Sequence, residues 1–401
     1  TTMAIDNKDK KILNVPHLRF PEFSGEWEMV SLQDIATINP KSDPLQNTFI
    51  YIDLEAVEKG ELRKIQEIMR EEAPSRAQRV IDNNDILFQC VRPYQKNNYI
   101  HRILNTSNQQ WVASTGYAQI RTTELPNYIY HLLNTDEFNR KVMVRCTGSS
   151  YPAINSEDLA TIHLYYTPDK KEQLKISRLL DLLDKRIATQ NKIIEKLQSL
   201  IKGLSQQLLS SENDWILYRL DDLAQIKSGY SGTQVSYQTP YKVSRIETIS
   251  KHCIDIQRIG YVECIPESYR LNVGNILFSN INSIQYIGNT AYLDKDYGLY
   301  HGMNLLRIIP NTTIVRPRFL HLLLCTDWAI NHFQTICNKA VSQASINQTA
   351  LGKSRFPIPP MSVQQQICSM FELTERKLDN EQEYISCLQQ QKRYLLQKMF
   401  I

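Results

Sequence analysis

The stretch that decides the fold is residues 168–208, which read PDKKEQLKISRLLDLLDKRIATQNKIIEKLQSLIKGLSQQL. Its apolar side chains recur at alternating steps of four and three residues, the period that keeps one stripe of a coiled-coil helix against a partner. Pro168 opens the stretch, and Asp169 and Glu172 lie in the first turn, where acids suit the helix dipole. The spacing predicts a helix ending near Leu209. Its seam is Ile176, Leu180, Leu183, Ile187, Gln190, Ile194, Leu197, Ile201, Leu204 and Leu208.

The same seam appears a second time at the end of the sequence. Pro359 and Pro360 open this copy, and every seam position lies 191 residues after its counterpart. Both copies even place a polar residue at the same point, Gln190 and Glu381. An internal repeat predicts two copies of one structural unit. The second seam is Ile367, Phe371, Thr374, Leu378, Glu381, Ile385, Leu388, Lys392, Leu395 and Met399.

The repeat extends beyond the helices, through short matched landmarks. Between these landmarks the two halves diverge almost completely, and the offset drifts from 188 to 192 residues, as a few small loop insertions would produce. The landmarks are Trp27, Leu32, Asp34, Ala36 and Ile38 with Trp215, Leu220, Asp222, Ala224 and Ile226; residues 85–88 with 275–278; His131 with His321; and Ile154 with Ile346.

These patterns predict an α+β chain of two tandem globular domains, each followed by a long helix. Strand-like runs at 48–54, 86–91 and 118–122 are separated by turn signals, and a helix is expected over 128–145. The expected segments are an arm at 1–24, a first domain at 25–165, a helix at 166–210, a second domain at 211–357 and a helix at 358–401.

The direction of helix pairing stays open at this point. In an antiparallel coiled coil, facing residues have numbers that sum to about 575, and the two domains are expected at opposite ends of a rod. A parallel pairing would instead set Gln190 against Glu381. The sequence is compatible with both.

Composition narrows the class of protein. The chain has 401 residues, 42% of them hydrophobic, and a net charge of +4, which permits nucleic-acid binding without the dense basic stripe of a nonspecific binder. No apolar run approaches the ~18 residues of a membrane span. The eight cysteines form no C-x-x-C pair, so we expect free, mostly buried thiols and a cytoplasmic location.

Specific catalytic motifs are missing from the sequence. The run 352–354 reads Gly-Lys-Ser, but a phosphate-binding loop needs glycine at position 347, which is Asn347. There is no H-E-x-x-H, G-x-G-x-x-G or G-x-S-x-G motif. His131 and His321 each sit in an apolar helical run, where a structural role is favoured. We therefore expect no catalytic residue, metal site or cofactor in this chain.

Polar and basic residues gather in a few loops that differ between the halves. Lys and Arg neutralise phosphates, and Arg, Asn and Gln make paired hydrogen bonds to base edges; the alternative is that these loops are simply solvated. The candidate DNA contacts are Ser75, Arg76, Arg79, Arg92, Lys96, Tyr117, Ser149, Ser150 and Tyr151 in the first half, and Lys242, Arg245, Asn280, Asn282, His301, Asn304, Ser342, Gln343 and Ser345 in the second.

Together these features resemble the DNA-specificity subunits of type I restriction-modification systems. The resemblance spans the chain. Val363 and Asn275 depart from it, since they replace the acids equivalent to Glu172 and Asp85, and the Gly-Ser before Ile-Asn is intact only at 148–149. The residues that carry it are Arg19 to Pro21, Gly25 to Trp27, Leu32, Asp34, Ile35, Asp85 to Leu87, Pro168, Glu172, Gln173 and Ile176, with the copies Pro359, Gln364 and Ile367.

The resemblance implies a non-catalytic subunit with two target-recognition domains, each reading one half of a bipartite, asymmetric site in double-stranded DNA. It implies that the helices fix the gap and dock two methyltransferase subunits, which carry S-adenosylmethionine and modify adenine. Motor-nuclease subunits with ATP and Mg²⁺ complete the implied complex. Two alternatives remain: a coiled-coil scaffold whose two domains bind protein rather than DNA, and an enzyme whose site is not recognised.

Overall fold

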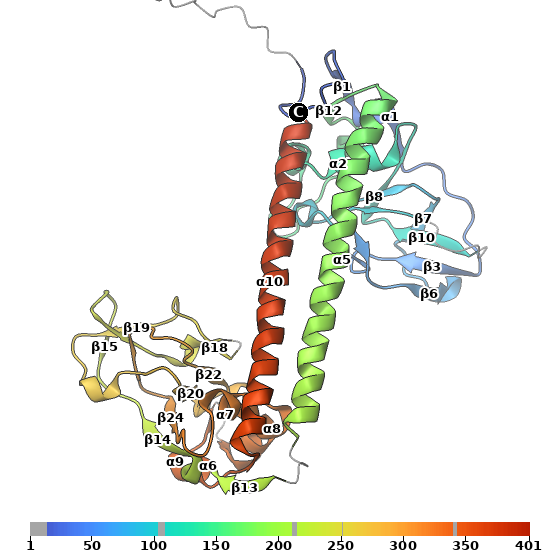
Figure 1. The fold of residues 1–401 in the computed structure, drawn as a ribbon. Coiled ribbons are helices and arrows are strands. Elements are labelled where there is room, and N and C mark those ends of the chain that lie inside the picture. Colours follow the sequence, from blue (N-terminus) through green and yellow to red (C-terminus); the bar gives the residue numbers. More distant parts are fainter. Residues whose placement is uncertain (1–13, 103–108, 211–214, 251, 340–342) are drawn as a thin grey trace, which may run out of the picture. The chain divides into compact units, whose positions relative to one another are not determined.

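The computed structural model describes residues 14–102, 109–210, 215–250, 252–339 and 343–401. The chain divides into two compact units (Figure 1). The first unit comprises Thr1–Asn191 with Glu383–Ile401, and the second comprises Lys192–Gln382. Each unit contains its own sheets and short helices together with a part of both long helices. Among the described residues, no helix is long and apolar enough to cross a membrane.

The two long helices are α5 (Lys170–Leu208) and α10 (Met361–Met399), each 39 residues long. Their first residues and their last residues are both 191 positions apart, so the structure confirms the predicted repeat. A proline lies one or two residues ahead of the first residue of each helix. Proline is common at a helix start because the N–H that it lacks would have no partner within the helix there.

A buried glutamine fastens the start of each long helix to its own unit. The Gln173 side chain donates a hydrogen bond to the carbonyl oxygen of Thr167 at 2.7 Å, and Gln364 donates to that of Pro359 at 2.9 Å. Each side-chain oxygen also accepts a bond from a backbone N–H just ahead of a short helix, at 3.2 and 2.8 Å. Both amides are thus satisfied in the interior, which explains why a polar residue recurs at this position.

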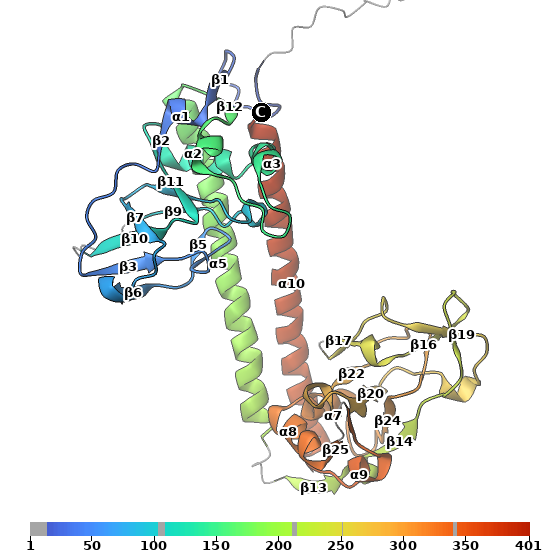
Figure 2. The same cartoon turned by 180° about the vertical axis from the view of Figure 1, so that it is seen from behind.

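Within each unit, the parts of α5 and α10 lie side by side and run antiparallel (Figures 1 and 2). In the first unit, Lys392 of α10 is ion-paired with Asp184 of α5 at 2.5 Å. In the second unit, Leu204 of α5 packs on the core that contains Phe371 of α10. These residue numbers sum to 576 and 575, which agrees with the antiparallel register and not with the parallel one.

No apolar residue of the predicted seam is exposed. Burial is deepest near the start of each long helix, where the short helices and sheets also cover it. The buried members are Ile176, Leu180, Leu183, Ile367, Phe371, Ile385, Leu388 and Met399, and the partly buried ones are Ile187, Ile194, Leu197, Ile201, Leu204, Leu208, Leu378 and Leu395.

The first unit is built from short strands and helices. These are β1 (Glu28–Ser31), α1 (Leu32–Ile35), β2 (Ala36–Ile38), β3 (Thr48–Ile52), β4 (Val57–Glu58), β5 (Glu61–Leu62), β6 (Gln66–Met69), β7 (Ala77–Ile81), β8 (Ile86–Gln89), β9 (Tyr99–Ile100), β10 (Gln110–Ser114), β11 (Tyr117–Thr122), α2 (Pro126–Leu133), α3 (Asp136–Arg145), α4 (Ser156–Ala160) and β12 (His163–Tyr166). One sheet has the order β2-β11-β8-β9 and is antiparallel; the other, β6-β3-β10-β7, contains the parallel pair β3–β10.

The second unit repeats this design. Its elements are β13 (Ile216–Arg219), α6 (Leu220–Leu223), β14 (Ala224–Ser228), β15 (Gln234–Val235), β16 (Tyr241–Val243), β17 (Ile249–Ser250), β18 (Cys253–Ile254), β19 (Gly260–Val262), β20 (Ile276–Phe278), β21 (Ile281–Asn282), β22 (Thr290–Tyr292), β23 (Leu299–Tyr300), β24 (Leu306–Pro310), α7 (Pro317–Leu324), α8 (Asp327–Ile336), β25 (Asn338–Lys339), β26 (Ala344–Ser345), α9 (Gln348–Gly352) and β27 (Arg355–Ile358). Its antiparallel sheet β14-β24-β20-β22 corresponds to β2-β11-β8-β9.

The helix expected over 128–145 is in fact two helices, α2 and α3, and this prediction was wrong. Thr135 interrupts it, since its extended backbone and its hydroxyl, which accepts from the Phe138 N–H at 3.2 Å, make it the N-cap of α3. Thr326 caps α8 in the same way. These caps are 191 residues apart, so His321 corresponds to Tyr130, and the pairing of His321 with His131 was off by one position.

The two departures from the family pattern have local structural reasons. Asp85 accepts hydrogen bonds from the Arg121 guanidinium at 2.8 Å and from the Asp82 N–H. Asn275 accepts equivalent bonds through its amide oxygen, from Arg307 at 2.8 Å and from a backbone N–H three residues earlier. The acceptor is therefore retained in the second unit without the charge.

Glu172, the acid that Val363 replaces in the second half, binds the N-terminal arm through Arg19. Its buried carboxylate pairs with Arg19 at 2.7 Å and accepts from the Thr167 hydroxyl at 2.8 Å. Among the described residues, no helix or strand lies between the end of α5 and β13, which begins at Ile216. Val363, at the equivalent position, instead packs against the core of the second unit, where an unpaired carboxylate would be costly to bury.

Candidate nucleic-acid interface

Two loops predicted separately from the sequence meet in the first unit. The chain leaves β8 through Val91, which forms a β-bridge with Ala153. The next residue, Arg92, donates its backbone N–H to the Pro152 carbonyl oxygen at 2.8 Å, and its guanidinium carbon lies 4.3 Å from the centre of the Tyr151 ring. A cation held over an aromatic face at this distance is attracted by the ring. The two loops therefore form one continuous surface.

The backbone around Arg92 holds a conformation that few residues adopt. Arg92 and Lys96 both have left-handed backbones, with φ of 54° and 52°, which cost of order 1 kcal/mol or more for a residue with a side chain. Lys96 anchors its end of the loop, because its ammonium bonds to Asp136 at 2.6 Å and to the Asn134 carbonyl oxygen at 3.1 Å. The loop is held in place from both ends, and Arg92 is its half-buried cation.

Among the described residues, no carboxylate is paired with the guanidinium of Arg79 on β7. Its Nε is buried and has no hydrogen-bond partner among the described residues, and burial lowers the pKa of its guanidinium. It nevertheless stays charged at neutral pH. Ser75 and Arg76 are exposed in the turn that leads into this strand, and the Arg76 carbonyl oxygen accepts from the Thr115 N–H at 2.9 Å. A half-buried cation of this kind favours an anionic or hydrogen-bond-accepting ligand.

The second unit builds the same surface with different side chains. Ile281 pairs with Ser345 across β21 and β26, as Val91 pairs with Ala153. Amides take the place of arginines here. Asn280 has a buried Oδ1 with no hydrogen-bond partner among the described residues, and the Asn282 side chain donates to the Ser279 hydroxyl at 3.2 Å.

A second polar patch of this unit surrounds a recess of about 430 Å³. Arg245 and Asn304 line it, together with Gln234 and Glu247, and Glu247 lies 3.6 Å from the Arg245 guanidinium. Lys242 is exposed on β16 nearby in the sequence.

The structure sorts the remaining candidates by exposure. Tyr117 is fully buried, with its hydroxyl donating to the Asp53 carbonyl oxygen at 3.3 Å. His301 is buried against the Leu305 carbonyl oxygen at 3.0 Å, and burial lowers its pKa to about 4. Packing in the interior removes both side chains from the surface. Ser149, Ser150 and Gln343 are exposed, Ser345 is half-buried, and Ser342 lies outside the described residues.

Two exposed tyrosines belong to this surface but were missed. Tyr94 is 51% exposed in the 3₁₀ turn after Arg92, and Tyr286 is 49% exposed in the corresponding turn of the second unit. Aromatic rings at such positions offer flat area for stacking on bases or sugars. The signal in the sequence was an aromatic residue a few positions after each matched strand, five after β8 and eight after β20.

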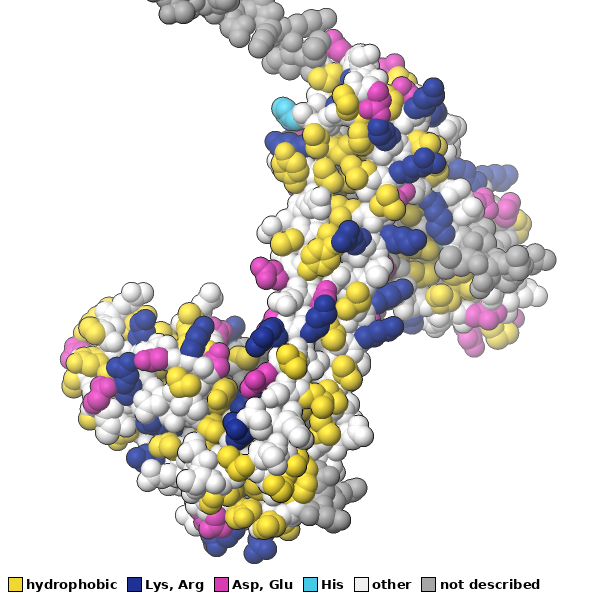
Figure 3. Space-filling model, viewed as in Figure 1, with side chains coloured by type: hydrophobic (Ala, Val, Ile, Leu, Met, Phe, Trp, Pro, Cys, Tyr) yellow, Lys and Arg dark blue, Asp and Glu magenta, His cyan; other side chains and the backbone are white. Residues whose placement is uncertain are grey.

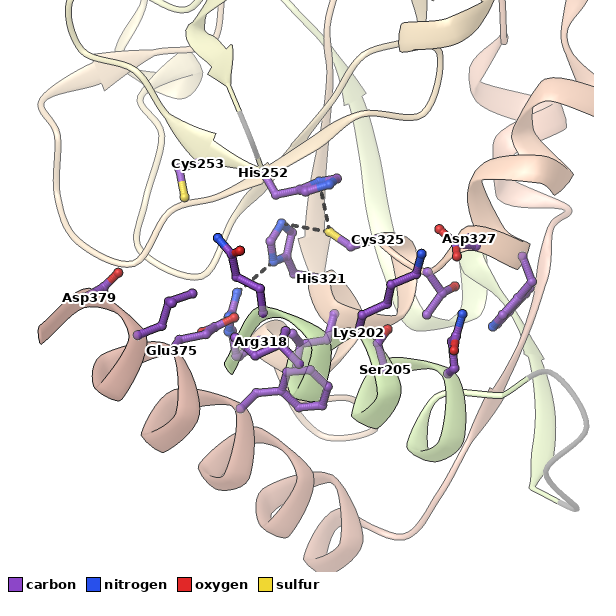
Figure 4. Close-up of a pocket in the computed structure, with 18 of the residues that line it drawn as sticks. Lys202, Ser205, His252, Cys253, Arg318, His321, Cys325, Asp327, Glu375 and Asp379 are labelled. Carbon is purple, nitrogen blue, oxygen red and sulfur yellow. Dashed lines mark hydrogen bonds and ion pairs between the residues drawn. The ribbon is translucent and has the colours of Figure 1, made fainter. Parts of the chain in front are cut away.

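A large pocket in the second unit is lined by none of these candidate residues (Figure 4). It has a volume of about 1050 Å³ and is lined by residues of α5, α7, α8 and α10. Arg318 bonds to Glu375 and, at 2.9 Å, to the His321 Nδ1, while the Cys325 thiol contacts His252 at 3.3 Å. Burial raises the pKa of Cys325 to about 12, so its thiol stays protonated and is a poor nucleophile. The described residues hold no metal-binding cluster of His, Cys, Asp and Glu.

Basic side chains gather on the exposed face of α5, where Figure 3 shows Lys and Arg along the helix. In the first unit's part of this helix, the exposed charged residues are all basic, because the acids are buried or turned toward neighbouring elements. The exposed bases are Lys170, Lys171, Lys175, Arg178, Lys185 and Arg186.

Comparison with known proteins identifies the family. The family model described as the type I restriction modification DNA specificity domain matches residues 24–199 and again residues 212–390. The chain belongs to this family. The two matches confirm the tandem repeat, and with it the family resemblance of the sequence.

Curated relatives of this specificity family match part of the chain. The putative type I restriction enzyme MjaX specificity subunit of Methanocaldococcus jannaschii is 38% identical over 193 residues, which cover 47% of this chain and 45% of that one. The HindI specificity subunit of Haemophilus influenzae is 23% identical over 186 residues, 45% of this chain and 37% of that one. The matched segments thus span less than half the length of these relatives.

Two solved structures share the fold. A chain from a structure of complex assembly and conformational transition in the type I restriction-modification system aligns with a TM-score of 0.61 and 19% identity, covering 93% of this chain and 97% of that one. The type I system S subunit from M. genitalium aligns with a TM-score of 0.59 and 14% identity, covering 96% and 99%.

Proposed function

We propose that the chain directs a type I restriction-modification complex to a bipartite, asymmetric DNA site, and that each unit reads one half. One observation carries this proposal: the two units place the segment after a matched strand against the loop before a matched helix, yet fill that surface with different side chains. A repeated frame with unlike polar contents suits two readers of unlike sequences. The protein-binding scaffold remains the alternative.

In the first unit, Arg92 is proposed to read a base edge. A guanidinium donates two parallel hydrogen bonds to guanine O6 and N7 in the major groove. Its stacking on Tyr151 and its anchored backbone fix the direction in which it points. Arg79, Arg76, Ser75, Ser149 and Ser150 are proposed to contact phosphates or neighbouring bases.

In the second unit, the amides of Asn280 and Asn282 are proposed to read adenine. An asparagine side chain donates a hydrogen bond to adenine N7 and accepts one from the N6 amino group. The buried Oδ1 of Asn280, which has no hydrogen-bond partner in the described part of the chain, supports this assignment, because an unsatisfied acceptor gains a bond when a base amino group approaches. Lys242 and Arg245 carry charge for phosphates, and Asn304, Gln343 and Ser345 supply further polar groups.

The long helices are proposed to set the gap between half-sites and to dock two methyltransferase subunits. Those subunits would carry S-adenosylmethionine and modify adenine, and motor-nuclease subunits with ATP and Mg²⁺ would cleave unmodified DNA. The chain itself is proposed to catalyse no step. The segments 25–165 and 211–357 are the proposed target-recognition domains, with the arm at 1–24 and the helices at 166–210 and 358–401.

A domain exchange tests this proposal. Replacing residues 27–165 with the first domain of another family member is expected to change one half of the recognised site and leave the other half unchanged, because each unit carries its own loops and core. The measurement is methylome sequencing of cells that express the native and the exchanged protein with the methyltransferase.

The reciprocal exchange of the second domain serves as the control and should change the other half only. If either exchange altered both halves, the units would not read DNA independently. If no motif were methylated with the native protein, the proposal itself would fail.

A further inference from the structure

The second unit buries an arginine at a position where the first unit has a glutamine. Arg307, on β24, is only 4% exposed. It is paired with Leu277 of β20, and the same pairing in the first unit joins Leu87 of β8 with Gln119 of β11. The repeat therefore places a guanidinium in the second unit where the first unit has a neutral amide.

The described hydrogen-bond partners of Arg307 are both neutral. Its Nε donates to the Asn275 amide oxygen at 2.8 Å, and its Nη1 donates to the Ser268 carbonyl oxygen at 3.3 Å. A guanidinium has five N–H donors and stays charged in proteins, so these two bonds leave donors to spare. Burial lowers the pKa of Arg307, and no carboxylate in the described part of the chain is paired with it. A buried charge without a counter-ion is costly.

A second cation lies directly opposite Arg307. Lys227 of β14 is its partner across the antiparallel strands, so both side chains lie on the same face of the sheet, where a pair of like charges is destabilising. In the first unit the residue beside Gln119 is Asn39, whose backbone N–H donates to the Gln119 carbonyl oxygen at 2.7 Å. Both positions thus change from neutral to positive between the units.

The acids around this position change in the same direction. In the first unit, Asp82 and Asp85 both pair with Arg121. The matching positions of the second unit hold Asn272, Asn275 and Ile309. The first unit therefore has two acids and one base here, whereas the second has two bases and no acid.

Arg307 and Lys227 line a recess of about 420 Å³. None of the described residues that line it is acidic. The neighbouring acid in the sequence, Glu267, accepts from the Tyr300 hydroxyl at 2.9 Å and lies 3.6 Å from the Arg270 guanidinium. The recess thus combines two positive charges with neutral polar groups. Its other polar lining residues are Ser228, Ser268, Tyr269, His301 and Gln348.

We propose that this recess binds a phosphate group, held by the remaining N–H groups of Arg307 and by the ammonium group of Lys227. Guanidinium groups bind phosphate through charge-assisted hydrogen bonds, and the anion offsets a charge that burial leaves without a carboxylate. Two sources carry this chemistry: free phosphate, and a phosphodiester of DNA, which rests on the proposed function. Gln348 follows the candidate contact Ser345 by three residues, so a DNA phosphate held here would help to position the second half-site.

Calorimetric titration of the full chain with inorganic phosphate, in chloride buffer of matched ionic strength, tests the first source. The native protein is expected to bind phosphate. Lys227→Asn and Arg307→Gln, which introduce the residue types of the first unit, should each weaken binding about tenfold or more, because each removes a charged donor. Circular dichroism with urea unfolding checks that the variants fold. Lys227 is exposed, so Lys227→Asn should fold normally and decides the test if Arg307→Gln does not fold.

Lys353→Asn is the matched control, because Lys353 is an exposed base of the same unit that does not line the recess. It removes the same charge and should bind phosphate like the native protein.

Target duplexes with single neutral methylphosphonate linkages test the second source, using the complex with methyltransferase. A DNA phosphate in the recess predicts one linkage in one half-site that weakens native binding about tenfold, because the cations lose the charge that they contact. The Lys227→Asn complex should no longer respond to that linkage, whereas the Lys353→Asn complex should respond like the native one.

The outcomes separate the two sources, and the inference from the proposed function. Phosphate binding that falls in Lys227→Asn alone of the two lysine variants supports a free anion, and a linkage effect that disappears in Lys227→Asn alone supports DNA. If Lys227→Asn and Lys353→Asn behaved alike in both measurements, the phosphate site would be overturned. Absence of specific DNA binding by the native complex would instead overturn the proposed function, and the calorimetric titration would then decide the inference by itself.

Discussion

Replacing Leu388 with lysine is expected to lower the free energy of unfolding by about 2–5 kcal/mol, the usual cost of losing a buried leucine. Leu388 is 6% exposed on the seam of α10, in the part of the helix that belongs to the first unit. The charge adds to the cost unless the long lysine side chain reaches water. Urea unfolding followed by circular dichroism at 222 nm measures the change.

Leu197, the equivalent seam residue of α5, should tolerate lysine better. Leu197 is only partly buried, so the ammonium group of a lysine at this position reaches solvent with little rearrangement. We expect Leu197→Lys to cost less than half of what Leu388→Lys costs, and the double variant to approach the sum, since the two sites belong to different units. Leu200→Lys, at an exposed position, should change stability by less than about 0.5 kcal/mol. Native stability in the double variant would contradict the role of the seam.

The helices and the repeat of this fold were predictable because they follow from the periodic spacing of apolar residues. The bounds of α5 and α10 follow from the 3.5-residue spacing and the prolines ahead of it, and strands β3, β8 and β11 fall within one or two residues of the expected runs. The antiparallel register is decided by contacts such as the ion pair of Lys392 with Asp184, which are 208 positions apart in the sequence. Such contacts have no local signal in the sequence.

Errors arose where a single residue changes the local geometry. Thr135 lies in the short polar run from Asn134 to Glu137, which reads as part of one helix, yet its hydroxyl caps the start of a second helix. The His131–His321 pairing failed because a shared His-Leu-Leu string outweighed the caps at Thr135 and Thr326, which set the true offset. Short identical strings are weaker markers of equivalence than capping positions.

The candidate site was predictable only in part. Its loops were recognised by composition, but their meeting was not, because Arg92 and Tyr151 are 59 residues apart in the sequence. Tyr117 and His301 were selected as polar residues near loops, whereas their side chains pack inward. Whether a tyrosine or histidine beside a strand faces water depends on the register of the sheet, and a one-residue shift reverses it.

Arg92→Ala is expected to weaken specific DNA binding tenfold or more, since losing a bidentate base contact costs ~1–3 kcal/mol and about 1.4 kcal/mol is a factor of ten. Lys96 is another of the four basic candidates in the first half. Its side chain already bonds to Asp136 and Asn134, so replacing it would affect DNA binding through the conformation of the loop. Arg79 lacks such partners among the described residues and is the second choice.

The Arg92 prediction is checked by fluorescence anisotropy with the target duplex and a scrambled duplex, at matched salt, using the complex with methyltransferase. Arg92→Lys separates the possible contacts: lysine retains a phosphate contact but not the paired bonds to guanine, so specific binding should fall while scrambled binding stays near native. Arg140→Ala is the control, because the Arg140 side chain is 65% exposed and paired with Glu137 on α3. It removes the same charge and should leave the ratio of specific to scrambled affinity unchanged. Native affinity in Arg92→Ala and Arg79→Ala alike would place the reading surface elsewhere on the unit.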